Sequence, residues 1–511
     1  MAVASLSPEM RIRASWWQWI LRLVLIVGLL LPLLGSATPA ASGDLVRVIV
    51  QRANTSQAAE AFVRSLGGEV LMDLHLINAF VAKVPQQALS LLAEHPDVRH
   101  VSIDGPLTRH GKMDEDAFWK ELENTYNLSV EAHKAWKRGL FGEGITVAVV
   151  DSGVEKHTAR GRIISDFGDG VGKRLRVRVS TSTLSPHPND RYGHGTAVAG
   201  IIGGDGAISE GKYVGIAPRV TLVSVKVGGD DGTGYESDLV AGLQWLYDHK
   251  DELGVRVINL SVTAATWSSY HESPLDAAVE VMWFNGFVVV VAAGNNGDGI
   301  LYPPANDPFV ITVGAVNEHG TPRIKDDTIP EWSAWGTDEA GRVKPDLVAP
   351  GVRLVTTLAP RSVFSEEHEE WVVDDYYIRF SGTSASAAVV SGAVALLLQK
   401  EPDLTPDQVK YRLWASARSW PNMNERAGHG YLSVARALKL RTTESANEGV
   451  QISEFLTPPD TPIYWDGVNW GGVNWGGVNW GGVNWGGVNW GGVNWGGVNW
   501  GGVNWGANFE D

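Results

Sequence analysis

The hydrophobic positions that follow residue 144 alternate between two spacings along the chain. Short apolar runs, typical of strands that are buried on both faces, occupy residues 145–150, 220–225, 255–260 and 287–291. Segments with helical spacing lie between them, near residues 196–202, 237–249 and 275–284. This alternation predicts an α/β fold, in which helices cover both faces of a parallel sheet. Active sites of such sheets lie at the carboxyl ends of the strands.

Residues 44–104 carry a different pattern. Alternating or apolar runs predict strands at residues 45–50, 69–74, 77–84 and 98–103, and helical spacing covers residues 56–66 and 86–94. The order β-α-β-β-α-β is typical of a small ferredoxin-like α+β unit. A polar connector occupies residues 105–143, with a helical patch around residues 130–138.

Residues 380–398 begin with small, turn-permissive residues and continue as an alanine- and leucine-rich run that predicts a buried helix. Ser384 falls at or near the first turn of this helix. The backbone N–H groups there lack partners within the helix and the helix dipole is positive, so developing negative charge is stabilised. Ser384 is therefore a candidate nucleophile, although small residues on a packed helix also occur in ordinary cores.

The two ends of the chain differ from this globular pattern. In residues 1–43, Arg11 and Arg13 precede an apolar run at 23–34 and a small-residue stretch, which predicts a signal peptide; an uncleaved anchor is the alternative. Residues 441–463 are polar and then proline-bearing, which predicts a linker. In residues 464–511 a Gly-Val-Asn-Trp unit recurs every five residues. A period of five fits neither a helix nor a strand, so we expect a disordered tail or, alternatively, an adhesive array of indoles.

Composition narrows the classes of function. The net charge is −16 and no basic stretch appears outside the N-terminal segment, which argues against nucleic acid as a partner. The chain has no cysteine. An exported protein without disulfides must be stabilised by its core, by bound ions or by both.

Four motifs place catalytic residue types at element ends. Asp151 ends the strand at 145–150, His194 opens a helix in Asp-Arg-Tyr-Gly-His-Gly-Thr, and Asn295 follows the strand at 287–291; Ser384 completes the set. A serine hydroxyl needs a base to remove its proton as it attacks, and an imidazole oriented by a carboxylate supplies one. The Asn295 amide and the Ser384 backbone N–H could stabilise an oxyanion.

These motifs resemble those of the subtilases, the subtilisin-like serine endopeptidases, over residues 145–438. The triad order Asp151, His194, Ser384 is that of the family, and residues 214–218, 223–227, 257–261, 344–351 and 430–435 resemble further family landmarks. The resemblance implies a peptidase domain over residues 111–440 and an inhibitory, self-cleaved propeptide over residues 44–110. It implies that the cut lies between Gly105 and Asn124.

The same resemblance assigns binding roles. Ser261, Val262 and Thr263 would pair with the substrate backbone, and Ala292, Ala293 and Gly294 would form a wall of the primary specificity pocket. Because neither segment is charged, we expect a large apolar side chain in that pocket. No cofactor is required for the chemistry. Many subtilases bind structural calcium, and Asp190 and the pair Asp230 and Asp231 are the positions to inspect first.

The chain departs from the family pattern at several places. After Ser384 it reads Ala385-Ser-Ala-Ala388-Val389, without the usual proline and histidine, and Ala197 replaces a histidine of the helix that begins at His194. Thr263 replaces a common glycine. Residues 361–379 form an acidic stretch that is longer than usual. We expect a solvated acidic hairpin there, or alternatively a loop at the cleft edge that selects cationic substrates or holds a cation.

Three functions are consistent with these features. The first is a secreted, monomeric endopeptidase that processes itself and acts on protein or peptide substrates, with its own propeptide as inhibitor. The second is a surface-binding protein whose tail contacts sugar, cell wall or a membrane interface. The third is a dedicated maturase that removes one partner's leader peptide. The filled catalytic positions favour a peptidase.

Overall fold

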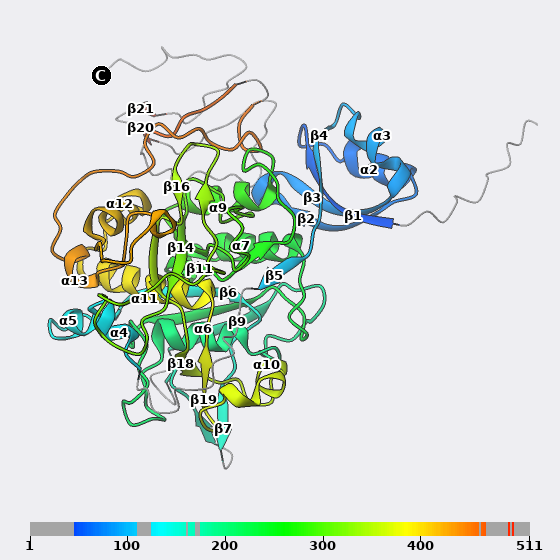
Figure 1. The fold of residues 1–511 in the computed structure, drawn as a ribbon. Coiled ribbons are helices and arrows are strands. Elements are labelled where there is room, and N and C mark those ends of the chain that lie inside the picture. Colours follow the sequence, from blue (N-terminus) through cyan, green and yellow to red (C-terminus); the bar gives the residue numbers. More distant parts are fainter. Residues whose placement is uncertain are drawn as a thin grey trace, which may run out of the picture.

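A seven-stranded parallel sheet forms the centre of the molecule (Figure 1). The computed structural model describes residues 45–109, 124–159, 162–168, 174–458, 461–466, 489–490 and 493–494. The sheet order is β17 (Leu347–Pro350), β14 (Ile311–Val316), β13 (Val288–Ala292), β11 (Val255–Leu260), β6 (Thr146–Asp151), β10 (Thr221–Lys226) and β9 (Leu175–Ser180). All neighbouring strands are parallel. The four strands predicted from apolar runs are its central strands β6, β10, β11 and β13.

Helices cover the two faces of this sheet, as predicted. Helices α6 (His194–Gly203) and α11 (Thr383–Lys400) contact each other, and α11 lies along β11, β13, β14 and β17. Helices α7 (Glu236–Asp248) and α9 (Pro274–Phe284) contact each other and form a second layer. Helix α11 is long and apolar enough to cross a membrane, but most of its length is buried in the protein, so it is a core helix.

Short elements complete the larger domain, which we call the peptidase domain after the resemblance noted above. The helices are α4 (Tyr126–Ser129), α5 (Ala132–Trp136), α8 (Lys250–Leu253), α10 (Val363–Glu367), α12 (Pro406–Ser416) and α13 (Val434–Ala437), with 3-10 turns η4 (Glu369–Trp371) and η5 (Glu425–Ala427). The antiparallel strand pairs are β7 (His157–Ala159) with β8 (Arg162–Ile164), β15 (Gly336–Thr337) with β16 (Val343–Lys344), and β18 (Leu354–Thr357) with β19 (Tyr377–Phe380). The stretch 361–379, expected as an acidic hairpin, begins with α10 and η4 and then forms a short hairpin, in which Val372 pairs antiparallel with Ile378 at the start of β19.

Residues 45–109, which we call the N-terminal domain, have the predicted β-α-β-β-α-β order. The elements are β1 (Leu45–Arg52), α2 (Ala58–Ser65), β2 (Glu69–Leu74), η1 (His75–Ile77), β3 (Ala79–Pro85), η2 (Gln86–Ala88), α3 (Leu89–Ala93), β4 (Val98–Ile103) and β5 (Leu107–Arg109). The antiparallel sheet has the order β2-β3-β1-β4. One sheet face forms a core of its own with α2 and α3, whereas Ile49, Leu76 and Val81 join the main core of the peptidase domain. The N-terminal domain is therefore docked and lies beside α7 and α9 (Figure 1).

Most of the stretch expected as a linker is packed against the peptidase domain. Val450, Ile452 and Phe455 are at most 4% exposed and belong to the main core, as does Trp465 at 3%. We call residues 446–458 and 461–466 the C-terminal arm. Its two halves pair through the backbone hydrogen bonds Ile452 N to Ile463 O (2.8 Å) and Trp465 N to Val450 O (2.8 Å). The arm is thus a folded part of the domain.

The predicted signal peptide at residues 1–43 lies outside the described residues, and so does most of the tryptophan repeat. Two pairs of repeat residues are described, β20 (Asn489–Trp490) and β21 (Val493–Asn494), which pair antiparallel.

Candidate functional site

Asp151 and His194 meet at the carboxyl edge of the central sheet. Asp151 is the last residue of β6 and His194 is the first residue of α6, and both are fully buried. His194 Nδ1 lies 2.8 Å from Asp151 Oδ1 and 2.9 Å from Oδ2. Phe380 meets the imidazole edge-on with ring centroids 5.2 Å apart. This arrangement fixes one ring nitrogen on a carboxylate and leaves Nε2 as the atom that can exchange a proton.

A second carboxylate, Asp190, organises the backbone that carries this pair. Its Oδ1 accepts from Gly193 N (2.7 Å) and from the hydroxyl of Ser152 (2.8 Å), the residue after Asp151. Its Oδ2 accepts from Thr196 N (2.8 Å) and Thr196 Oγ1 (2.6 Å) in the first turn of α6. Asp190 therefore satisfies two helix-terminal N–H groups and ties the Asp151 strand to the His194 helix. It is a positioning residue for both.

Ser384 lies in the first turn of α11, where the sequence predicts it. The side chain is fully buried and its hydroxyl donates to the carbonyl of Ser261 (3.2 Å). In return the hydroxyl of Ser261 donates to Ser384 O (3.3 Å). His194 Nε2 makes no hydrogen bond within the described part of the chain. The structure thus brings Ser384 to the Ser261 segment and leaves Nε2 available as an acceptor.

Asn295 is held next to the same helix start. Its Oδ1 accepts from both the backbone N–H and the hydroxyl of Thr383, each at 3.0 Å. The Thr383 hydroxyl also accepts from Gly294 N (3.1 Å). Because the oxygen of the amide is fixed on Thr383, its Nδ2H₂ group is the donor side. Thr383 therefore joins the Ala292–Gly294 turn to the residue before Ser384.

The segment expected to pair with substrate is a strand that already carries a partner. Strand β12 (Val262–Ala264) pairs antiparallel with β5, with Val262 opposite Arg109 and Thr263 opposite Thr108. On its other side, β5 is held by the hydrogen bond from Leu107 N to Gly234 O (2.7 Å). The end of the N-terminal domain thus forms the middle strand between residues 234–236 and β12. Ala292, Ala293 and Gly294 are buried at the end of β13.

The acidic stretch before Ser384 packs against the turn that carries His194. Val363 N and Phe364 N donate to the carbonyls of Arg191 and Tyr192, each at 2.9 Å. A Cβ on Gly193, whose φ is +107°, would come within 2.5 Å of Ser362 Oγ. Only glycine fits this left-handed position so close to α10. The insertion therefore supports the backbone of the catalytic turn.

The carboxylates singled out for calcium are engaged by protein donors. Asp190 accepts the four bonds given above. Asp230 Oδ1 accepts from Lys226 Nζ (2.5 Å) and Ser185 Oγ (2.9 Å), and Asp231 Oδ1 accepts from Thr233 Oγ1 (2.6 Å). Among the described residues, no group of three or more His, Asp or Glu side chains has an arrangement suited to a metal ion. Calcium binding stays an untested prediction.

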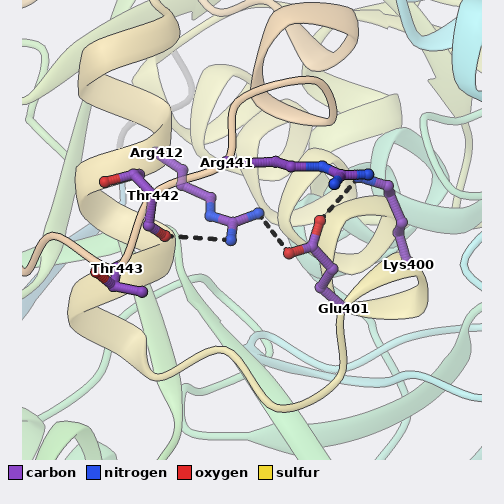
Figure 2. Close-up of a pocket in the computed structure, with 6 residues that line it drawn as sticks. All are labelled: Lys400, Glu401, Arg412, Arg441, Thr442 and Thr443. Carbon is purple, nitrogen blue, oxygen red and sulfur yellow. Dashed lines mark hydrogen bonds and ion pairs between the residues drawn. The ribbon is translucent and has the colours of Figure 1, made fainter.

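A hollow of about 640 Å³ lies away from this site (Figure 2). It is lined by Lys400, Glu401, Arg412, Arg441, Thr442 and Thr443. Glu401 lies 2.8 Å from both Lys400 Nζ and Arg412 Nη1, so two of the three cations are paired. None of the candidate catalytic residues lines this hollow.

Comparisons with known proteins agree with this geometry. A model described as "Subtilase family" matches residues 142–430, more than half of the chain. The chain belongs to the subtilase family. This subtilase is 34% identical over 374 residues to "Serine protease AprX" of Bacillus subtilis (strain 168), which covers 71% of this chain and 79% of that protein. It is 28% identical to "Subtilisin E" of the same organism, over 80% of this chain and 94% of that protein. It is a serine endopeptidase.

A solved structure supports the fold alone. Fervidolysin from Fervidobacterium pennivorans, "a keratinolytic enzyme related to subtilisin", superimposes with a TM-score of 0.59 at 23% identity. The match covers 78% of this subtilase and 61% of that chain.

Sequence reasoning missed several residues that support the site. Thr383, Ser152 and Thr196 were not singled out, and Asp190 was considered only as a calcium ligand. Each of the three hydroxyl residues adjoins a residue in a recognised motif, and that adjacency is the only signal in the sequence. Their hydrogen-bond partners lie on other segments, and a single sequence does not reveal such pairings.

We expect Asp190→Asn to lower kcat for peptide hydrolysis by about tenfold to hundredfold with a smaller change in KM. The amide would direct an NH₂ group at an N–H or hydroxyl donor and lose charge-assisted bonds of about 1.5–3 kcal/mol. Steady-state hydrolysis of a chromogenic peptide measures both constants. Asp403→Asn, an exposed carboxylate near α12, is the control. An unchanged kcat in the Asp190 variant would contradict the positioning role.

Proposed function

We propose that this subtilase is made as a self-cleaving zymogen and hydrolyses peptide bonds through Asp151, His194 and Ser384. Ser384 Oγ attacks the peptide carbonyl carbon while His194 Nε2 removes the hydroxyl proton. The same proton then passes to the leaving amine as the C–N bond breaks, and an acyl-enzyme forms. A water molecule repeats the sequence and releases the acid. Asp151 holds the Nδ1–H and stabilises the imidazolium in both steps.

The observation that carries this proposal is the buried contact between His194 and Asp151. A fully buried carboxylate whose two oxygens both face the Nδ1 atom of an imidazole holds the ring in one tautomer and one orientation. Ser384 lies at a helix start beside Ser261, one residue from the strand that carries β5. An extended peptide backbone on β12 therefore leads to Ser384.

Asn295 is the proposed side-chain donor to the oxyanion. Thr383 holds the amide by its oxygen, which orients the NH₂ group before any substrate binds. Donors that are fixed in advance need no reorganisation as the charge develops. The backbone N–H of Ser384 at the start of α11 is the second proposed donor.

The N-terminal domain is the proposed propeptide, which inhibits the enzyme by occupying its cleft. Asp104 accepts from Ser237 N (2.8 Å) and Ser237 Oγ (2.5 Å), so it satisfies a donor at the start of α7. Arg47 pairs with Asp104 and donates to Ser237 Oγ (2.8 Å). Together with the pairing of β5 and β12, these contacts support the proposed role, because the domain would cover the strand that is proposed to bind substrate. Substrates would be proteins or peptides with a large apolar side chain at the primary pocket.

We further propose that the enzyme is exported by residues 1–43 and acts as a monomer outside the cell. The net charge of −16 and the lack of cysteine are consistent with an exported protein stabilised by its core. The tryptophan repeat is proposed to contact a cell surface, a sugar or a membrane interface through its indoles.

The first test compares the N-terminal sequence and mass of the purified wild type with those of Ser384→Ala. We expect the wild type to lose its N-terminal domain and the variant to keep it. Strand β5 ends at Arg109, opposite Val262 at the start of β12, so we expect the cut to follow β5 and to lie before Asn124. The mass of the released fragment checks that position.

Equal removal of the N-terminal domain in the wild type and in Ser384→Ala, both purified from the same host, would contradict the proposal. Ser386→Ala is a matched control on the same helix, because its hydroxyl donates to Ala349 O and Pro350 O. It should process itself like the wild type.

A second prediction concerns pH. Glu236 packs directly against Gly105. A Cβ atom added to Gly105 would lie 2.8 Å from Glu236 Oε1. Burial, reinforced by the charge of Asp104, raises the pKa of Glu236 to about 8. Burial also raises the pKa of Asp238 to about 6, against the opposing effects of Thr183 and Arg47. Docking of the N-terminal domain therefore favours the protonated forms of the Glu236 and Asp238 carboxyl groups.

The affinity of the cleaved N-terminal domain should accordingly be highest below the ordinary pKa of a carboxyl group, fall by up to about tenfold per unit as the pH rises to about 8, and level off above that. Release measured by size-exclusion chromatography should accelerate from pH 6 to pH 8 and change little between pH 8 and pH 9. Glu236→Gln, neutral at every pH, should flatten this dependence, whereas Glu252→Gln on the exposed surface of α8 should not. A steep profile that survives in Glu236→Gln would contradict this assignment.

A further inference from the structure

The C-terminal arm touches two bodies, the peptidase domain and the N-terminal domain. On the peptidase side it is held by buried groups. The Glu280 carboxylate accepts from Ser453 N (3.0 Å), and the Asp407 carboxylate accepts from Asn447 Nδ2 (2.7 Å) and Trp465 Nε1 (2.5 Å). The Trp465 ring stacks on Phe284 with centroids 4.5 Å apart.

These contacts do not involve the N-terminal domain. They bury apolar side chains and supply hydrogen bonds to the buried carboxyl groups of Glu280 and Asp407, and both contributions are lost if the arm detaches. The arm therefore stays on the peptidase domain after the N-terminal domain is cut from the chain.

On its other side the arm presents backbone carbonyls to the N-terminal domain. Arg99 Nη2, on β4, donates to Glu454 O (2.7 Å) and closely to Thr457 O. Gln51 Nε2, on β1, donates to Phe455 O (2.5 Å). The His100 ring meets the Phe455 ring edge-on with centroids 5.8 Å apart. Three side chains from β1 and β4, those of Gln51, Arg99 and His100, therefore contact residues 454–457.

This contact is chemically distinct from the one at the cleft. At the cleft, Asp104 of the N-terminal domain accepts hydrogen bonds from the backbone N–H and the hydroxyl of Ser237 in α7. Strand β5 pairs with the edge of β12. At the arm, the Arg99 guanidinium and the Gln51 amide of the N-terminal domain donate to backbone carbonyls. A charged donor that serves two carbonyls contributes more to the binding free energy than a neutral donor does.

We propose that Glu454, Phe455 and Thr457 of the C-terminal arm form a second docking site for the N-terminal domain, which retains this domain after the self-cut. The inference rests on the proposed function, because it requires that the cut occurs. Two separate anchors on one body raise the effective concentration of each. Release of active enzyme then depends on the arm as well as on the cleft.

The test uses the full chain, purified and allowed to cut itself at pH 6. Size-exclusion chromatography at intervals gives the fraction of the cleaved N-terminal domain that still elutes with the enzyme. We expect Arg99→Ala to shorten this retention by about tenfold to hundredfold. Gln51→Leu, which removes one amide donor, should shorten it less.

Arg64→Ala is the matched control, because Arg64 is exposed on α2 of the same domain. It should retain the N-terminal domain like the wild type. Rates of the self-cut in all variants are measured on the same samples, and a wild-type rate shows that the variant domain has folded and reached the cleft.

Retention of the N-terminal domain by Arg99→Ala for as long as by the wild type, at a normal cut, would overturn the second docking site and leave the proposed function intact. A wild type that makes no cut would overturn the proposed function, and this inference with it. Slower cutting without faster release would also overturn the inference, because the arm would then act on folding and not on retention.

Discussion

The contact between the Asp151 carboxylate and His194 Nδ1 is the interaction on which the rest of the site depends. Both side chains are fully buried, and a buried charge is stable only when it is paired and hydrogen-bonded. The parallel sheet brings the end of β6 to the start of α6, and Asp190 fixes the backbone of both. Around this pair, Thr383 holds Asn295 and the start of α11 presents Ser384. The candidate catalytic groups come from β6, α6, α11 and the turn after β13, so their geometry depends on the packing of the whole domain.

The same packing defines how the N-terminal domain is bound. Its sheet shares the main core through one face and keeps a core of its own on the other. Its last strand, β5, forms the middle strand between residues 234–236 and β12, as an extended peptide would. The C-terminal arm adds carbonyl acceptors on a different side. Binding is therefore spread over a buried apolar face, a strand edge, a capped helix and the arm, and single contacts change its lifetime more than its position.

Features that depend on local pattern could be predicted from the sequence. Strands β6, β10, β11 and β13 are apolar runs, and helices α6, α7 and α9 have clear spacing, so the α/β class and the positions of Asp151, His194, Asn295 and Ser384 could be derived. Non-local contacts could not. The C-terminal arm contains no helix or named strand, so the apolar residues through which it docks have no helical or strand spacing in the sequence. The helical form of residues 363–367 depends on contacts with Arg191 and Tyr192, which are distant in sequence.

The most direct test of the central claim is covalent labelling of the purified chain with a serine-directed fluorophosphonate, followed by mass spectrometry of its peptides. The account predicts one adduct, on Ser384, that appears only as the N-terminal domain is released and that is absent from His194→Ala. Labelling of Ser384 at the same rate before and after release would contradict occupation of the cleft by β5. The absence of any adduct on Ser384 in the released enzyme would contradict the assignment of the nucleophile.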